Sequence, residues 1–298
     1  MAGVRQIFYR RRAAENICRI TRTMGIISTA KYKYYLNKRT AIVDYQNSLA
    51  KIAYLLITAA ELAKHPVLKF NGSAKRSAIF AIGSVRGLCG SYNDSVGRLV
   101  RMHVERASKS GRKLDVYATD GRLISVLRHR GIVPTKIFPE SELMFPNGWI
   151  KEIANDFVCQ YIAGEIDDFG VVYTHFHSVA SHRAQTLHIM PFVEFIDDLA
   201  TRATAIWPWE LTFENFLLSP SANEIIEDLA KTLIHMSMYC CLIDAILSEH
   251  VARMLAMKNA TENAEDMIRD LTGEYNKARQ NQITRELLDI IGGTGVLG

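Results

Sequence analysis

A heptad pattern of apolar residues dominates the last third of the chain. From position 222 to position 291 the sequence contains no proline and a single glycine, Gly273. Two rows of mostly apolar residues recur every seven positions, four positions apart, as the a and d positions of a coiled coil do. At about 1.5 Å per residue, this helix would be on the order of 100 Å long and would need a partner to cover its apolar side. The rows are Leu229, Met236, Ile243, His250, Met257, Ala264, Leu271 and Ala278, and Leu233, Cys240, Leu247, Met254, Thr261, Ile268, Tyr275 and Gln282.

A second long helix is predicted at the start of the chain. Residues 4–64 contain no proline, and their apolar positions recur with helical spacing, which we expect to form an apolar seam. Gly25 is the point at which this helix would bend or soften. Two long helices at opposite ends of a chain can close an antiparallel coiled coil. The apolar positions are Ala13, Ile17, Ile20, Met24 and Ile27, followed by Ala41, Tyr45, Leu49, Ile52 and Leu56.

Strand-like and helix-like segments alternate between the two ends, which predicts a mostly parallel, Rossmann-like α/β sheet with a hairpin at one edge. The fold class is therefore a mixed α and β fold, with a long antiparallel coiled coil of the terminal helices and an inserted α/β domain. The predicted domains are residues 1–65, 66–196 and 222–298, and residues 197–221 form a linker. Strands are expected at residues 77–84, 114–119, 133–138, 169–176 and 183–192, and helices at 92–108, up to 130, and at 149–164.

Composition limits the class of protein. Hydrophobic residues make up 48% and charged residues 22% of the 298 residues, as in an ordinary soluble protein, and the longest apolar runs are too short to span a bilayer. The arginine-containing N-terminus lacks the apolar region of a secretory signal. Five cysteines without a CxxC pair favour reduced thiols in the cytosol. We therefore expect an intracellular protein.

Charge is distributed unevenly. Residues 1–39 carry ten Lys and Arg against one acid, whereas residues 222–298 carry twelve acids against seven bases. The contrast could match the two terminal helices to each other, or direct the basic end to an acidic partner, a nucleic acid or a membrane surface. The run from Lys31 to Tyr35 interleaves lysine with tyrosine, as in a basic nucleic-acid adaptor. A solvated helix face is the favoured interpretation, and no nucleic-acid partner is expected.

The candidate chemical sites are weak. Glycines at 83, 87 and 90 follow the first strand, but their spacing matches neither a dinucleotide nor a P-loop motif, so an α/β nucleotide-binding enzyme with coiled-coil arms is only an alternative. His175 and His177 share one strand face, with His182 and His188 nearby, yet no further ligands complete a zinc set. We expect no catalytic residues, no metal, no cofactor and no direct nucleotide binding.

Several motifs resemble those of the gamma subunits of F-type ATP synthases. The run Ser248–Ala264 (SEHVARMLAMKNATENA) is similar to the signature helix of that family, and so is the stretch that starts at Tyr275 (YNKARQ) and continues to Gly293. Near the front, Asn16 with Arg19–Met24 and Ala30–Lys31 resembles the family's first helix. The resemblance covers essentially the whole chain and is most specific at the C-terminal end.

This resemblance implies a rotating central stalk. In the family, an asymmetric coiled-coil shaft stands inside a ring of alpha and beta subunits and biases each beta subunit differently, which couples transmembrane flow of H⁺ or Na⁺ to ATP synthesis or hydrolysis. The chain would be a non-catalytic subunit of a hetero-oligomer. The α/β domain would meet the epsilon subunit and the c-ring. The residues implied to face alpha and beta are Met24, Glu249, Arg253, Arg279, Gln280, Thr284 and Glu286.

Two of these residues have an alternative explanation, because Glu249 and Arg253 could form an ordinary i,i+4 pair worth a few tenths of a kcal/mol. Val85 and Ser91 depart from the family pattern, so a divergent second F-type ATPase is an alternative. The expected location is peripheral, on the cytoplasmic face of a bacterial inner membrane. The resemblance further implies an apolar shaft tip at Ile290, Ile291, Val296 and Leu297, and a loop at the epsilon and c-ring end formed by Arg86, Gly87, Leu88, Cys89 and Gly90.

Overall fold

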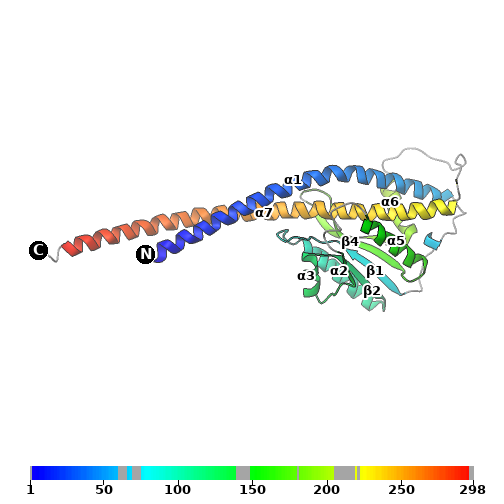
Figure 1. Cartoon of the computed structure of the whole chain (residues 1–298), viewed down its shortest axis with the longest axis horizontal. Helices are drawn as coiled ribbons and strands as arrows, with labels where there is room; N and C mark the ends of the chain where they lie inside the picture. The colour runs from blue at the N-terminus through cyan, green and yellow to red at the C-terminus, as the bar shows by residue number, and fades with distance from the viewer. Residues whose placement is uncertain are drawn as a thin grey trace. The chain divides into compact units, whose positions relative to one another are not determined.

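The computed structural model describes residues 2–59, 66–68, 75–138, 148–179, 181–204, 219 and 222–294. The chain divides into two compact units: Met1–Ala30 with Arg253–Gly298 form unit 1, and Lys31–Ala252 form unit 2. Each unit contains a part of both long helices, α1 (Ala2–Ala59) and α7 (Ala222–Thr294), which Figure 1 shows in blue and in yellow to red. The predicted fold class, two long terminal helices with a mixed α/β domain between them, is confirmed.

Helix α1 continues through Gly25 without interruption. A Cβ atom at Gly25 would meet only the Met257 Cβ, at an ordinary contact distance of 3.7 Å. The glycine therefore sits on the side of α1 that faces α7. A missing side chain at that position lets the two helices approach each other without interrupting either one.

Unit 2 contains a five-stranded sheet in the order β3-β2-β1-β4-β5. All neighbouring strands are parallel except β4 and β5, which form the hairpin predicted at one edge. The order places β1 between β2 and β4, so the chain leaves β1 in one direction across the sheet and later returns on its other side. The strands are β1 (Arg76–Ala81), β2 (Lys113–Thr119), β3 (Lys136–Phe138), β4 (Asp168–Phe176) and β5 (His182–Met190).

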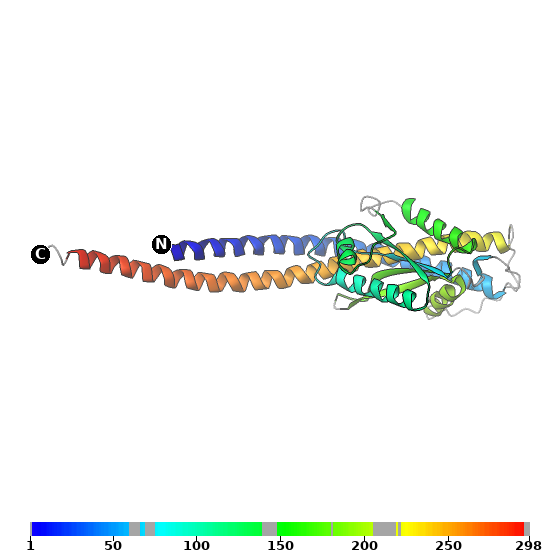
Figure 2. The same ribbon diagram turned by 90° about the horizontal axis from the view of Figure 1, so that it is seen from below.

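Helices cover both faces of this sheet (Figure 2). Ile79 and Ala81 of β1 pack with α2 (Tyr92–Lys109) and α3 (Arg122–His129) on one face. Phe80 and Ile82 point to the other face, into a core with α5 (Gly148–Ile162), α6 (Phe192–Thr204) and α7. The same core includes Ala50 and Ala53 of α1 and the short helix η1 (Pro66–Leu68). The unit 2 parts of both long helices are thus built into the hydrophobic core of the α/β domain.

Helix α6 corrects one prediction. Residues 197–204 were expected to begin the linker, but they form the second half of α6. Phe192, Phe195, Ile196 and Leu199 recur with helical spacing, and all four are buried. The remainder of the predicted linker lies outside the described residues, apart from Ser219.

Part of α7 is long and apolar enough to cross a membrane by length and composition alone. More than half of that stretch is buried inside the protein. Burial among the protein's own side chains accounts for its apolar character.

Candidate partner-binding surface

The two helices of unit 1 pair in an antiparallel arrangement. Thr21 and Thr261 share a hydrogen bond of 2.7 Å between their hydroxyl groups, and Phe8 lies 6.3 Å from Tyr275 between ring centroids. From the Phe8–Tyr275 contact to the Thr21–Thr261 contact, the residue number rises on α1 and falls on α7, so the two helices run in opposite directions. Arg22 forms an ion pair with Glu265, as expected if the basic front and the acidic end of the chain match each other. Both ends of that pair are largely exposed, so its contribution to stability is small.

The α7 side of this pairing follows the predicted heptad. Met257, Ala264 and Leu271, all from the first row, are buried, and the second row is half-buried. The prediction of a coiled-coil seam on α7 is therefore confirmed in unit 1.

The α1 side does not follow the prediction. Ile17, Ile20 and Ile27, expected in the seam, are 52%, 58% and 50% exposed. The reason is that small side chains on the neighbouring face let α1 approach α7 more closely than the isoleucines would. The buried positions of α1 in unit 1 are Ala14, Cys18, Thr21 and Ser28.

The exposed isoleucines define a surface that we call the outer stripe: Ile17, Ile20 and Ile27, with half-buried Met24 on the same side of α1. A contiguous apolar row that its own chain leaves uncovered is typical of an interaction surface. Near its C-terminal end, α7 also exposes large apolar side chains, namely Ile283, Leu287 and Leu288.

The residues expected to face the alpha and beta subunits fall into three environments. Met24 and Glu249 are half-buried, whereas Arg279, Gln280, Thr284 and Glu286 are exposed. Arg253 is only 6% exposed, so within this chain its guanidinium does not lie open to a passing loop. Of the residues expected at the shaft tip, Ile290 and Ile291 belong to α7, but the structure does not describe their side chains. Val296 and Leu297 lie outside the described residues.

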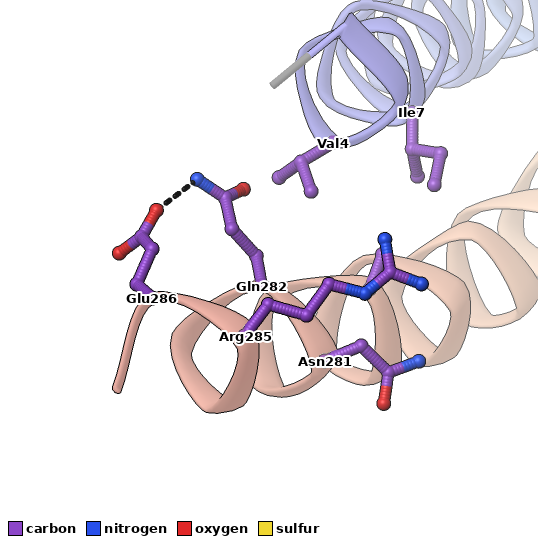
Figure 3. A pocket seen from close by; sticks show the side chains of 7 residues that line it. Val4, Ile7, Asn281, Gln282, Arg285 and Glu286 are labelled. Carbon is purple, nitrogen blue, oxygen red and sulfur yellow. Dashed lines mark hydrogen bonds between the residues drawn. The ribbon is translucent and has the colours of Figure 1, made fainter. Parts of the chain in front are cut away.

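A hollow of about 440 Å³ lies between the start of α1 and the C-terminal part of α7 (Figure 3). Val4 and Ile7 of α1 point toward α7, which supplies polar side chains, and Gln282 donates a hydrogen bond of 2.7 Å to Glu286. An apolar wall with a polar rim suits a side chain of a partner protein. The sequence prediction missed Val4 and Ile7, although their helical spacing was visible. The lining residues are Val4, Ile7, Ala278, Asn281, Gln282, Arg285 and Glu286.

The loop after β1 holds a tight, strained turn. Leu88 adopts a φ of 64°, which is unfavourable for a leucine, and its side chain is 58% exposed. Behind it, Cys89 is buried and its Sγ lies 3.3 Å from the Ser84 hydroxyl. Asn93 accepts a hydrogen bond from the Ser84 N–H (2.9 Å) and donates one to the Ser84 hydroxyl (2.7 Å). These bonds hold the loop that presents Arg86, Gly87 and Gly90. Asn93, which belongs to none of the sequence motifs, is thus part of the support of this loop.

Helix α7 lies where a nucleotide would bind in an α/β fold of this order. Ligands of such folds occupy the crevice at the carboxyl ends of the strands, where the chain direction across the sheet reverses. Here the Tyr92 hydroxyl, at the start of α2, donates a hydrogen bond to the Ala245 carbonyl (2.9 Å). Ser248 donates one to the Thr174 carbonyl of β4 (3.1 Å). The carboxyl ends of the strands thus bind one of the chain's own helices.

Two of the four histidines considered as zinc ligands contact carboxylates of the protein itself. The His175 Nδ1 lies 2.5 Å from an Asp244 carboxylate oxygen, and the His188 Nδ1 lies 3.5 Å from Asp168. Among the described residues, no group of three metal-ligating side chains comes together. Close to Asp244, burial raises the pKa of the Cys240 thiol to about 12, which leaves it protonated and unreactive at neutral pH.

An antiparallel helix pair with an exposed apolar row, and an α/β domain whose ligand crevice holds one of the chain's own helices, are typical of a protein that works inside a larger assembly. Comparisons with known proteins support this class over the full length. A sequence model described as ATP synthase matches residues 3–297. An ATP synthase gamma chain of Rhodopirellula baltica is 35% identical, with 100% of this chain and 99% of the relative covered. One from Methylacidiphilum infernorum is 30% identical, with 97% of each covered.

Solved structures agree at the level of the fold. A chain of the Euglena gracilis mitochondrial ATP synthase, solved as an assembly of OSCP, F1 and c-ring, matches with a TM-score of 0.67 at 17% identity. That match covers 99% of this chain and 95% of the other. A chain of the Tetrahymena thermophila central stalk and c-ring matches with a TM-score of 0.57 at 19% identity, covering 81% of this chain and 99% of the other.

The chain belongs to the ATP synthase gamma-chain family, the non-catalytic central-stalk subunits of F-type ATP synthases. The family, the function and the non-catalytic role predicted from the sequence are therefore confirmed. Membership also makes the chain a part of a membrane-associated complex.

Proposed function

We propose that this chain turns as the shaft of its ATP synthase, with the helix pair of unit 1 enclosed by alpha and beta subunits. The observation that supports the proposal is the outer stripe, because an apolar row on a two-helix shaft needs partner surfaces to cover it. The exposed end residues Arg279, Gln280, Thr284 and Glu286 would meet the same ring, and so would Met24, Glu249 and Arg253. Arg253 would require a local rearrangement because it is buried.

The α/β domain of unit 2 would rest on the epsilon subunit and the c-ring. The loop Arg86–Gly90 suits a docking role because it presents the exposed Leu88 side chain on a turn held by buried hydrogen bonds. The functional division is then residues 1–65 and 222–298 as shaft, and 66–196 as docking domain, which α6 extends to residue 204. The complex would lie at the cytoplasmic face of a bacterial inner membrane.

The mechanism follows from asymmetry. Two helices present different side chains in different directions, so the shaft makes different contacts with each of three chemically identical beta subunits. Only contacts that differ between conformations can shift their populations. Turning the shaft moves these contacts from one beta subunit to the next, and thereby changes nucleotide affinities in sequence.

Co-expression with the alpha and beta subunits of the same genome tests the proposal. We expect a stoichiometric complex that hydrolyses ATP, and a several-fold lower rate for the Arg279→Ala/Gln280→Ala variant. Lys277→Ala, an exposed residue on the same stretch of α7, is the control. A wild-type chain that stays soluble by itself and does not co-purify would disprove the rotor role.

A further inference from the structure

One buried carboxylate joins three elements of unit 2. The Asp244 side chain on α7, 7% exposed, accepts hydrogen bonds from the Arg39 guanidinium of α1, with one Nη2–Oδ2 distance of 3.4 Å. The His175 Nδ1 of β4 lies 2.5 Å from an oxygen of the same carboxylate. The sheet, α7 and α1 are therefore linked through a single side chain.

Two further directional bonds lie beside this link. Ser248, one turn after Asp244, donates to the backbone carbonyl of Thr174, the residue before His175. Tyr92 donates to the carbonyl of Ala245, the residue after Asp244. We call this group the clamp: Arg39, Tyr92, His175, Asp244 and Ser248.

Directional bonds add to apolar packing in fixing the rotation of α7 in this region. The helix is buried on nearly every side between positions 241 and 252, and most of those side chains are apolar. Hydrophobic burial depends on area and has no preferred direction. Charge-assisted hydrogen bonds are directional, and they break when the helix turns or slides by a fraction of a turn. The clamp therefore gives the angle of α7 against the sheet a directional restraint that burial alone does not supply.

We propose that the clamp carries torque between the α/β domain and the two shaft helices. This inference rests on the rotor role proposed above. When the domain is turned, the load on α7 and α1 is borne by the hydrogen bonds of Arg39 with Asp244, by the close contact of His175 with the same carboxylate, and by the hydrogen bonds of Ser248 and Tyr92. These are positioning residues: they touch no nucleotide, and they act by keeping the shaft angle locked to the domain angle.

The critical variant replaces the ion pair with apolar groups, Arg39→Met/Asp244→Leu. Replacing a buried ion pair with well-packed apolar residues is often neutral for stability. This variant therefore removes the directional bonds between the two side chains but keeps both side chains buried. The matched control is Arg76→Met/Asp115→Leu. The Arg76–Asp115 pair is similarly shielded, at 35% and 6% exposed against 26% and 7%, but joins β1 to β2. A second variant, Asp244→Asn, keeps a hydrogen-bonding side chain and removes the charge.

The whole ATP synthase is reconstituted into vesicles, and ATP hydrolysis is measured with charge movement reported by a potential-sensitive dye. With the potential collapsed by ionophores, we expect every variant to hydrolyse ATP within twofold of wild type. As the potential builds and opposes rotation, we expect the apolar clamp variant to move at least threefold fewer charges per ATP. Asp244→Asn should fall between, and the control should match wild type.

A clamp variant whose charges per ATP equal those of the control under load would overturn the proposal. Failure of the clamp variants to assemble, where the control assembles, would overturn it as well, because the cluster would then serve folding. Failure of the wild-type chain to enter any complex is a different result, and it would contradict the rotor role itself.

Discussion

At the scale of single residues, Gly121 shows how a backbone position without a side chain supports the loop after β1. Its φ is 109°, and a Cβ atom there would lie 2.5 Å from the Val85 Cα. The backbones of the two loops therefore touch at the carboxyl ends of β1 and β2. Only glycine permits this approach, which supports the residues just before Arg86.

We expect Gly121→Ala to destabilise the protein by about 3 kcal/mol, because strain and a clash with backbone atoms add together. Urea unfolding of the purified chain, followed by circular dichroism, measures this. Gly111→Ala is the control: its φ is also positive, at 66°, but nothing lies within 4 Å of the added atom. That change should cost about 1 kcal/mol. Equal losses in the two variants would show that the contact with Val85 is unimportant.

His188 provides a test of local electrostatics. The hydrogen bond to the Asp168 carboxylate, opposed by burial, raises the pKa of His188 above its usual value. His103 lies on α2, and the centroid of its ring is 6.3 Å from that of His188 on β5. Burial lowers the pKa of His103. We expect Asp168→Asn to lower the pKa of both imidazoles, measured by NMR titration. A His188 pKa that does not change in this variant would remove Asp168 as the cause.

The consequence for stability has a definite sign. Because the folded pKa of His188 is raised, the link stabilises the folded state below the unfolded pKa of about 6.5, and this contribution is lost as pH rises through the folded pKa. The His188 side chain is 57% exposed, so the effect should be small. We expect the free energy of unfolding of the wild type to exceed that of Asp168→Asn by well under about 1 kcal/mol near pH 6. The difference should vanish at higher pH.

At the scale of elements, the sequence predicted helices better than it predicted their faces. The heptad on α7 is long and apolar, so its buried side could be found by period alone. On α1, the same criterion predicts burial of the isoleucines, which are exposed, because hydrophobicity is not what decides burial on this helix. Contact with α7 instead depends on size, and Ala14 and Ser28 are buried because they are small. Helix α6 was missed although its apolar spacing was visible, since nearby prolines suggested a linker.

The chemistry of the sites was less accessible to sequence reasoning for a spatial reason. Arg39, His175 and Asp244 come from three elements, more than sixty residues apart in each pairing, and meet only through the sheet order. No local motif marks such a set. The exposed end residues of α7, by contrast, could be nominated because they lie within one continuous motif.

Gly25 tests the packing of the helix pair. We expect Gly25→Ala to stabilise unit 1 by about 0.5–1 kcal/mol, because alanine favours helix and its Cβ fits at 3.7 Å from the Met257 Cβ. Gly25→Leu should instead destabilise by about 1–3 kcal/mol through overpacking. Gly273 on α7 has nothing within 4 Å and serves as the control, where both changes should stabilise. Thermal unfolding that ranks Gly25→Leu with Gly273→Leu would contradict close packing at Gly25.

At the scale of the whole molecule, the fold separates what holds the chain together from what it offers to others. In unit 2, the crevice that commonly binds a nucleotide is filled by α7, so the domain serves as a mount for its own helices. On the α1 side of unit 1, small residues form the seam and large ones are exposed. Stability and assembly therefore depend on different residues of α1, and mutation can separate them.

The double variant Ile17→Gln/Ile20→Gln tests this separation. Both side chains are more than half exposed, so the free energy of unfolding of the free chain should change by no more than about 0.5 kcal/mol. Recovery of the alpha–beta complex in co-purification should fall several-fold, because the apolar row can no longer be covered favourably.

Two further variants serve as controls. Leu271→Ala changes a seam residue that is 3% exposed, so it should instead lower the free energy of unfolding of the free chain by about 2–4 kcal/mol. Ile26→Gln, 66% exposed but outside the outer stripe, is the control for a general loss of apolar surface. If it weakens co-purification as much as the double variant, the outer stripe is not the surface that the partners cover.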